Sequence, residues 1–109
     1  MIKIIILKSL RDEILKTFKK GSLKIYSLIE ELKQNPNKGR VLGHVGSMSI
    51  REIRYKSFRL YYIIDGHQLN LFNKELIKEL LIRFIAMSKK NDQQKTIDGI
   101  KQMLEILEK

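Results

Sequence analysis

The chain contains no cysteine. Disulfides, thiolate metal sites and a cysteine nucleophile are therefore excluded, and the composition fits a reducing compartment. No stretch approaches the roughly 18 apolar residues of a membrane-spanning helix. The first apolar run, Ile4 to Leu7, is too short for the core of a signal peptide and suits a strand. We therefore expect a cytoplasmic protein with no membrane partner.

Several motifs for cofactors and nucleophiles are also missing. Gly39, Gly43 and Gly46 match neither a P-loop nor a dinucleotide fingerprint, because no Gly-Lys-Ser/Thr follows them. The sequence has no Gly-x-Ser-x-Gly elbow. His44 and His67 have no acidic or histidine partner at metal-ligand spacing. We therefore expect neither a metal site nor a small-molecule cofactor.

What the chain does have is positive charge. Its 109 residues suit a single domain spanning 1–109, and 43% hydrophobic residues suffice for one core. The formal charge of +10 favours a polyanionic partner, which could be nucleic acid, an anionic membrane surface or an acidic protein. Much of the lysine can be solvated surface. Arginine, whose planar fork binds phosphate bidentately, is therefore the more selective signal.

The basic residues are concentrated in one segment. Between Lys38 and Arg59 there are six basic residues and a single acid, Glu52. Three of the six arginines in the chain lie within nine residues of each other, from Arg51 to Arg59. We therefore expect this segment to bind a phosphate backbone. Its candidate RNA-binding residues, apart from the arginine pair discussed below, are Lys38, Arg40, Arg51 and Lys56.

The first third of the chain predicts a strand and a helical hairpin. The β-branched run at 2–7 suits a strand. Asp12 and Glu13 are expected in the first turn of the first helix, as the helix dipole prefers. The expected caps and ends are Ser9, Gly21, Ser22 and Asn35-Pro36-Asn37. The expected apolar faces are Leu10, Ile14 and Phe18, then Ile25, Leu28, Ile29 and Leu32.

The second third predicts a loop followed by two strands. Lys38 to Ser49 contains three of the six glycines, which favours a loop. Strands are expected at 48–55 and 58–64, joined by a very short turn at Lys56-Ser57. Asp65-Gly66 is a strong turn signal after the second of these strands.

The last third predicts a buried strand and a C-terminal helix. Leu80 to Met87 is apolar enough for a central strand, whereas 67–79 could equally begin a helix at Asn73. Asn91 or Asp92 can cap the last helix. Its expected buried stripe contains Ile97, Ile100, Met103, Leu104 and Leu107. The expected order is β-α-α-β-β-β-α, an α+β fold in which an N-terminal strand and a helical hairpin precede a three-strand antiparallel meander.

The short turn fixes the register of the expected hairpin. It places Arg54 opposite Arg59 and Glu52 opposite Tyr61, and alternation puts these four side chains on one face. Like charges directly opposite destabilise a sheet by roughly 0.2–1 kcal/mol. The arginine pair therefore predicts an anion between them, with Glu52 and Tyr61 as a base and a hydroxyl donor. The other face is expected to join the core through Ile53, Tyr55, Phe58, Leu60, Tyr62 and Ile64.

Simpler interpretations of these residues remain open. The two arginines can splay into solvent, and Glu52 can be a local counter-ion for Arg54. Tyr61 can pack on the next strand, against Ala86 or Leu80. A loop of odd length would move the two arginines to opposite faces.

The element order and several short motifs resemble the RelE/ParE superfamily of bacterial and archaeal toxins, and its HigB branch in particular. The resemblance covers nearly the whole chain. It is carried by Asn35-Pro36, Glu52-Ile53-Arg54, Phe58-Arg59-Leu60-Tyr61-Tyr62, Met87-Ser88-Lys89-Lys90 and the Gln-rich helix start Asp92-Gln93-Gln94-Lys95.

The resemblance implies a ribosome-dependent messenger-RNA endonuclease that needs no metal and is held inactive by a cognate antitoxin. In such enzymes the 2′-hydroxyl attacks the adjacent phosphodiester, which requires a base, cations on the phosphorane and a proton donor. Arg59 matches the position that would hold the scissile phosphate, and Arg54 matches the basic position on the preceding strand. Lys90, or Lys89 before it, matches the basic residue that ends the last strand.

Some positions depart from the family pattern. Several RelE-type nucleases have a functional tyrosine near the start of the last helix, where this chain has Thr96. Tyr61 is then the candidate acid, and Glu52, where some members have a lysine, is the candidate base. The stretch between Asp65 and Leu80 is longer than typical, which predicts an extra element.

Three functions are compatible with these residues. The first is an RNA-cleaving toxin, which the clustered arginines and lysines favour. The second is a ParE-type inhibitor of DNA gyrase that does not cut RNA, which the missing tyrosine favours. The third is a basic nucleic-acid-binding domain without catalysis.

Overall fold

The computed structural model describes residues 2–71 and 75–108. Five strands form one mixed sheet in the order β1-β5-β4-β3-β2. β1 runs parallel to β5, and the other neighbours are antiparallel. The strands are β1 (Ile2–Ile6), β2 (Arg40–Val45), β3 (Met48–Tyr55), β4 (Phe58–Leu71) and β5 (Glu75–Lys89).

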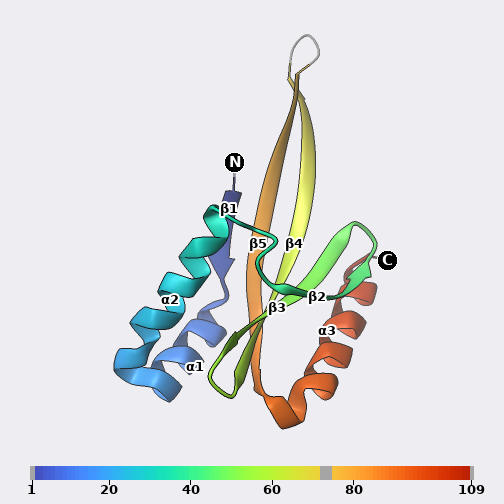
Figure 1. Cartoon of the computed structure of the whole chain (residues 1–109). Helices are drawn as coiled ribbons and strands as arrows, with labels where there is room; N and C mark the ends of the chain where they lie inside the picture. Colours follow the sequence, from blue (N-terminus) through green and yellow to red (C-terminus); the bar gives the residue numbers. More distant parts are fainter. Residues whose placement is uncertain (1, 72–74, 109) are drawn as a thin grey trace.

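The helices cover both faces of this sheet, as Figure 1 shows: α1 and α2 lie on one side and α3 on the other. This arrangement confirms the α+β class. No helix in the described ranges is long and apolar enough to cross a membrane. The helices are α1 (Lys8–Phe18), α2 (Ser22–Glu30) and α3 (Gln93–Glu108), with 3₁₀ turns η1 (Lys19–Gly21), η2 (Glu31–Lys33) and η3 (Lys90–Asp92).

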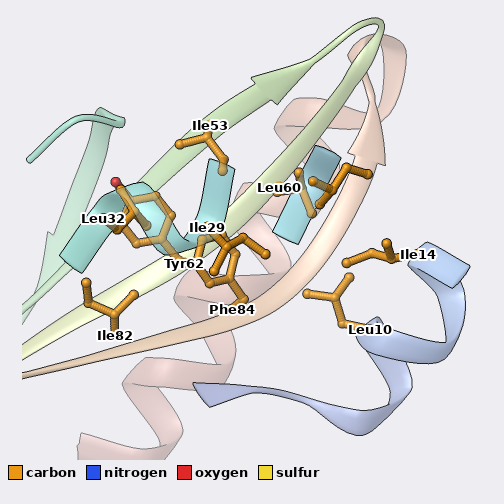
Figure 2. Close-up of a cluster of buried hydrophobic side chains, with 10 residues drawn as sticks. Leu10, Ile14, Ile29, Leu32, Ile53, Leu60, Tyr62, Ile82 and Phe84 are labelled. Carbon is orange, nitrogen blue, oxygen red and sulfur yellow. The ribbon is translucent and has the colours of Figure 1, made fainter. Parts of the chain in front are cut away.

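The main core lies between the sheet and α1 and α2 (Figure 2). Tyr62 and Phe84 stack there with ring centroids 4.9 Å apart, and the Tyr62 hydroxyl accepts a hydrogen bond from the Gly39 N–H at 3.0 Å. The spacing of apolar residues in both helices predicted this core correctly, because those residues fall on one side of each helix. Its buried members are Leu10, Ile14, Ile25, Ile29, Leu32, Ile53, Leu60, Tyr62, Ile82 and Phe84.

A second core lies between the other face of the sheet and α3. It contains Met48, Ile50, Tyr61, Ile63, Ile97, Ile100 and Leu104. Met103 was expected in this stripe but is 43% exposed, because Ile97, Ile100 and Leu104 already form the line that meets the sheet. The side chain of Leu107, also expected there, lies outside the described part of the chain.

The expected loop at 38–49 is wrong, because it contains β2. The strand pairs with β3 through Arg40↔Glu52 to Val45↔Met48, with an irregularity between Val41 and Gly43. Gly46 has a φ of 58° in the turn between the two strands. Two of the three glycines that favoured a loop, Gly43 and Gly46, therefore serve a bulge and a tight turn within a hairpin, whereas Gly39 lies before β2.

The expected turn at Asp65-Gly66 is also wrong. β4 continues through both residues, which pair with Leu81 and Leu80 of β5. A local dipeptide signal is overridden here by continued pairing with the neighbouring strand. The strand expected at 80–87 is confirmed, because it lies within β5. The alternative helix start at Asn73 lies outside the described residues, and the chain is already in β5 from Glu75 onward. The observed fold therefore has four strands between α2 and α3.

The expected helix caps are wrong in detail. α1 begins at Lys8, so Ser9 lies inside the helix and neither expected acid falls in its first turn. Leu7 donates its N–H to the Phe84 carbonyl at 3.1 Å, which holds the chain on the sheet until the helix starts. α1 ends before Gly21. Ser22 is the buried first residue of α2, and its hydroxyl donates to the Ile14 carbonyl at 3.3 Å instead of capping.

Candidate nucleic-acid interface

The hairpin of β3 and β4 has the register that the sequence predicted. Arg54 pairs with Arg59 and Glu52 with Tyr61, around a two-residue turn in which Lys56 has a φ of 55°. The apolar partners on the opposite face join the main core. The alternative of an odd-length loop is therefore wrong, and the four polar side chains share the face on which α3 lies.

Burial divides these four side chains. Arg54 is exposed, whereas Glu52, Arg59 and Tyr61 are 1%, 5% and 0% exposed. Three members of the predicted cluster are thus buried, and one, the Arg54 cation, is exposed to solvent. We call the buried Glu52, Arg59 and Tyr61, together with their half-buried neighbours Ser88 and Gln93, the buried polar layer. Hydrogen bonds join Gln93 to Glu52 and Ser88 to Tyr61, and the charges of Glu52 and Arg59 both act on Tyr61.

Glu52 is held from two directions. Its Oε2 accepts a hydrogen bond from the Gln93 side-chain amide at 2.9 Å, at the first residue of α3. Its Oε1 lies 3.7 Å from the Arg54 Nε, so the counter-ion interpretation of Glu52 is confirmed. That oxygen is nevertheless buried and has no hydrogen-bond partner. Gln93 had no assigned role in the sequence, where its place in the Gln-rich helix start was the only signal.

Arg59 is incompletely satisfied as well. Its Nη1 donates to the Phe58 carbonyl at 3.3 Å, but its Nε is buried without a partner. A buried donor or acceptor left unsatisfied costs about 1–3 kcal/mol, and more when it is charged. Two such atoms in one small layer call for a functional explanation.

Tyr61 connects this layer to the surface through Ser88. Its hydroxyl lies 2.7 Å from the Ser88 Oγ, and its ring packs in the second core beside Ala86, as one of the simpler interpretations predicted. Burial raises the pKa of Tyr61, while the hydrogen bond to Ser88 opposes that shift. Tyr61 therefore keeps its proton at neutral pH. Sequence reasoning gave no role to Ser88, which only the register of β4 and β5 brings to this position.

Ser88 lines a surface pocket of about 520 Å³ between α1 and the start of α3. Lys89 and Asp92 line the same pocket, and so does Thr96, the residue near the expected tyrosine. The wall from α1 is made by Glu13 and Thr17. A substrate group in this pocket could reach the Ser88 hydroxyl but not the buried Tyr61.

Exposed cations surround the turn of the hairpin. Lys89 pairs with Phe58, and the Lys90 N–H donates to the Ser57 carbonyl at 3.2 Å, so this lysine pair lies beside the hairpin as expected. The Lys56 ammonium lies 5.4 Å from the centroid of the Tyr55 ring. We call the exposed residues Arg54, Lys56, Lys89 and Lys90 the basic hairpin end.

The other RNA-binding candidates differ in their freedom. The Arg51 Nη1 donates to the carbonyls of Asn37 and Gly39 at 3.3 and 3.1 Å, which fixes the segment before β2. Lys38 forms an ion pair with Glu31. Arg40 is exposed on β2, opposite Glu52. Within the described ranges no three His, Cys, Asp or Glu side chains gather into a metal-binding group.

Comparison with known proteins adds no relative to this description. No model of a known protein family matches the chain, and neither a curated protein nor a solved structure does.

Proposed function

We propose that this chain is the toxin of a type II toxin–antitoxin pair of the RelE/ParE kind, a ribosome-dependent endoribonuclease that cleaves messenger RNA and so inhibits translation. One observation carries the proposal: the register that sets Arg54 opposite Arg59 at the strand end bearing Lys89 and Lys90. The chain would act in the cytoplasm on messenger RNA at the ribosome, and a cognate antitoxin would hold it inactive. It requires no metal or small-molecule cofactor.

The basic hairpin end supplies the RNA-binding half of this function. Arg54, Lys56, Lys89 and Lys90 are exposed and lie around one turn, where they can neutralise successive phosphates of an RNA strand. Arg54 adds a planar fork suited to bidentate phosphate binding. Binding of this kind weakens steeply as salt rises, because each neutralised phosphate releases counterions.

The buried polar layer supplies the groups for cleavage. Attack of a 2′-hydroxyl on the neighbouring phosphorus needs a base, for which Glu52 offers its unsatisfied Oε1. Arg59, with an unsatisfied Nε, would stabilise the charge on the phosphorane. Tyr61 would supply the proton for the leaving 5′-oxygen through Ser88, which faces the surface pocket. Because the layer is covered, cleavage requires that the start of α3 move and the Gln93–Glu52 hydrogen bond break.

The burial of Glu52, Arg59 and Tyr61 favours a second candidate function. If α3 stays in place, the three groups cannot touch a substrate, and the exposed cations act alone. The chain would then be a non-catalytic toxin, such as a ParE-type inhibitor of DNA gyrase, or a nucleic-acid-binding domain.

The experiment adds the protein to a translating cell-free extract and maps the 5′ ends of the message. We expect position-specific cuts, reduced about a hundredfold or more in Arg59→Ala and Arg59→Lys, since one lost transition-state contact has that effect. Lys24→Ala, which removes an exposed charge from α2, is the matched control and should cut normally. Melting curves of all variants separate lost chemistry from lost folding.

Other outcomes assign the other functions. Intact message together with blocked supercoiling by gyrase would exclude the nuclease and support the gyrase inhibitor. Intact message with salt-dependent binding of nucleic acid, and no effect on gyrase, would leave only the binding domain.

A further inference from the structure

A polar pocket lies away from the hairpin turn, between β2 and α3, which are neighbours at the edge of the molecule in Figure 1. Its volume is about 370 Å³, and its polar lining comes from Arg40, Gln93, Gln94 and Lys101. In the described part of the chain, neither Arg40 nor Lys101 forms an ion pair or a side-chain hydrogen bond. Two cations without counter-ions, beside amide groups, favour an anionic ligand.

The backbone of β2 makes room for one of these cations. A Cβ atom at Gly43 would lie 3.1 Å from the Lys101 Cε and 3.3 Å from its Nζ, closer than ordinary van der Waals contact. The irregularity in the pairing of β2 with β3 falls at this glycine. The absence of a side chain at Gly43 thus allows Lys101 to lie against the strand, in the same pocket as Arg40.

A second pocket shares the lining residue Arg40 with the first, but its apolar lining comes from the α2 side of the sheet. It has a volume of about 330 Å³ and a largely apolar lining that includes Leu28 and Ile53. It lies where β2 begins, since pairing with β3 extends only to Arg40↔Glu52 while β3 continues to Tyr55. Lys38, Arg54 and the buried carboxylate Glu52 also line it. Arg54 also belongs to the basic hairpin end, so the pocket and the hairpin end share this residue.

The two pockets together match the chemistry of a nucleotide, which joins an anionic phosphate to a flat apolar base. We propose that they bind one nucleotide of a single-stranded RNA, with its phosphate between Arg40 and Lys101 and its base against Leu28 and Ile53. The strand must be single because a base enters such a pocket only when it is unstacked and unpaired, and an arginine at the pocket wall can stack on it. The site extends the RNA path from the basic hairpin end and therefore rests on the proposed function.

The phosphate half is tested by titrating a labelled single-stranded RNA with the full chain at several salt concentrations. Lys101→Ala and Arg40→Ala should each weaken binding about tenfold. Each should also make the negative slope of log affinity against log salt concentration shallower by about 0.7. Lys24→Ala removes the same charge from α2 and should change neither quantity appreciably. Gly43→Val should reproduce the loss of Lys101→Ala, and adding it to Lys101→Ala should have little further effect, because both changes act on one cation.

The base half is tested with RNAs that carry a single abasic residue at each position in turn. We expect one position at which loss of the base weakens binding by the wild-type chain. The Leu28→Trp variant has a narrower apolar pocket. It should bind the intact RNA and the RNA that is abasic at this position equally well. Equal binding of all the abasic RNAs by the wild-type chain would overturn the base pocket.

The controls distinguish this site from the proposed function. If Lys101→Ala binds RNA as well as Lys24→Ala does while Lys89→Ala binds less well, the second site is wrong and the hairpin end stands. Loss in Lys101→Ala without loss in Lys89→Ala would keep the nucleotide site and overturn the hairpin end. A free mononucleotide that binds as tightly as RNA, or a glutamate-rich peptide that displaces RNA, would overturn the assignment in favour of that ligand.

Discussion

The two faces of the β3–β4 hairpin share one backbone but bury different kinds of side chain, apolar on one face and partly polar on the other. On the side of α1 and α2, ten buried side chains of the described residues form an apolar core, in which the Tyr62 hydroxyl accepts a hydrogen bond from the Gly39 N–H. On the side of α3, a smaller apolar cluster adjoins the buried polar layer. Strict alternation of side chains makes this division possible, because one face can supply cohesion while the other is free to hold charged groups.

The difference also divides the free energy of folding. Burial of aliphatic and aromatic groups stabilises the first face, at about 25 cal/mol per Å² of apolar surface. On the second face, Glu52 and Arg59 are removed from water and each keeps an unsatisfied polar atom. Desolvation of such ions costs several kcal/mol each, which their contacts only partly offset. We infer that the apolar face stabilises a fold that the polar layer weakens.

The largest effect should come from the apolar face. Phe84→Ala removes a fully buried ring that stacks on Tyr62, and should lower the free energy of unfolding by about 3–5 kcal/mol. Urea unfolding followed by circular dichroism measures this change. A decrease in the free energy of unfolding of less than about 1 kcal/mol would contradict the inference that this face provides most of the stability.

An intermediate effect is expected within the polar layer. Glu52→Gln and Arg59→Met each leave the other charge with less compensation, whereas the double variant removes both buried charges. The double variant should therefore be more stable than the two single effects predict, by about 1–2 kcal/mol. Urea unfolding of the four proteins gives the coupling directly. Additive effects would show that Glu52 and Arg59 do not share one electrostatic environment.

Alkaline pH should destabilise the fold more modestly. Burial raises the pKa of both Tyr61 and Tyr62 above the ordinary value of 10.0, so the folded chain holds these protons more tightly than the unfolded chain. Their contribution is complete below that value and is lost as the pH rises through the folded pKa values. Melting temperatures measured as the pH rises through and above 10.0 should fall in the wild type and fall less steeply in the Tyr61→Phe variant. An identical decline in both proteins would show that Tyr61 is not responsible.

The smallest effect is expected outside both cores. Leu23 on α2 is 75% exposed, and Leu23→Ala should change the free energy of unfolding by less than about 0.5 kcal/mol. The same urea experiment serves as a control for Phe84→Ala, since both remove a large apolar side chain. A change comparable to that of Phe84→Ala would mean that hydrophobic surface as such, and not the apolar face, governs stability.

The features that local rules control were predictable from the sequence. A two-residue turn and a period of two specify the register of Arg54 with Arg59, and a period near 3.6 specifies the apolar sides of α1 and α2. β2 was missed because glycines at a bulge and at a turn look like a loop in the sequence. The continuation of β4 past Gly66 depends on its pairing with β5, which a local signal does not contain.

The burial of the candidate site was not predictable from the hairpin alone. Alternation places Glu52, Arg59 and Tyr61 on one face but does not say that α3 covers it. The partners Gln93 and Ser88 come from elements that are remote in sequence, and only the assembled sheet brings them to Glu52 and Tyr61. Exposure and hydrogen-bond partners are tertiary properties, and for that reason the sequence predicted the residues of the site but not their accessibility.

The parallel pairing of β1 with β5 sets the order in which the molecule can be assembled. Ile2 is paired with Leu80 and Ile6 with Phe84, so β1 must wait for β5, which is synthesised much later. Contacts this distant along the chain form slowly. The long intervening loop must lose conformational entropy before the pairing contributes its favourable free energy. Until β5 is available, the β-branched residues of β1 have no sheet to join. A growing chain therefore leaves β1 unpaired until β5 has been made, and capture of β1 by another molecule in that interval would keep the chain unfolded.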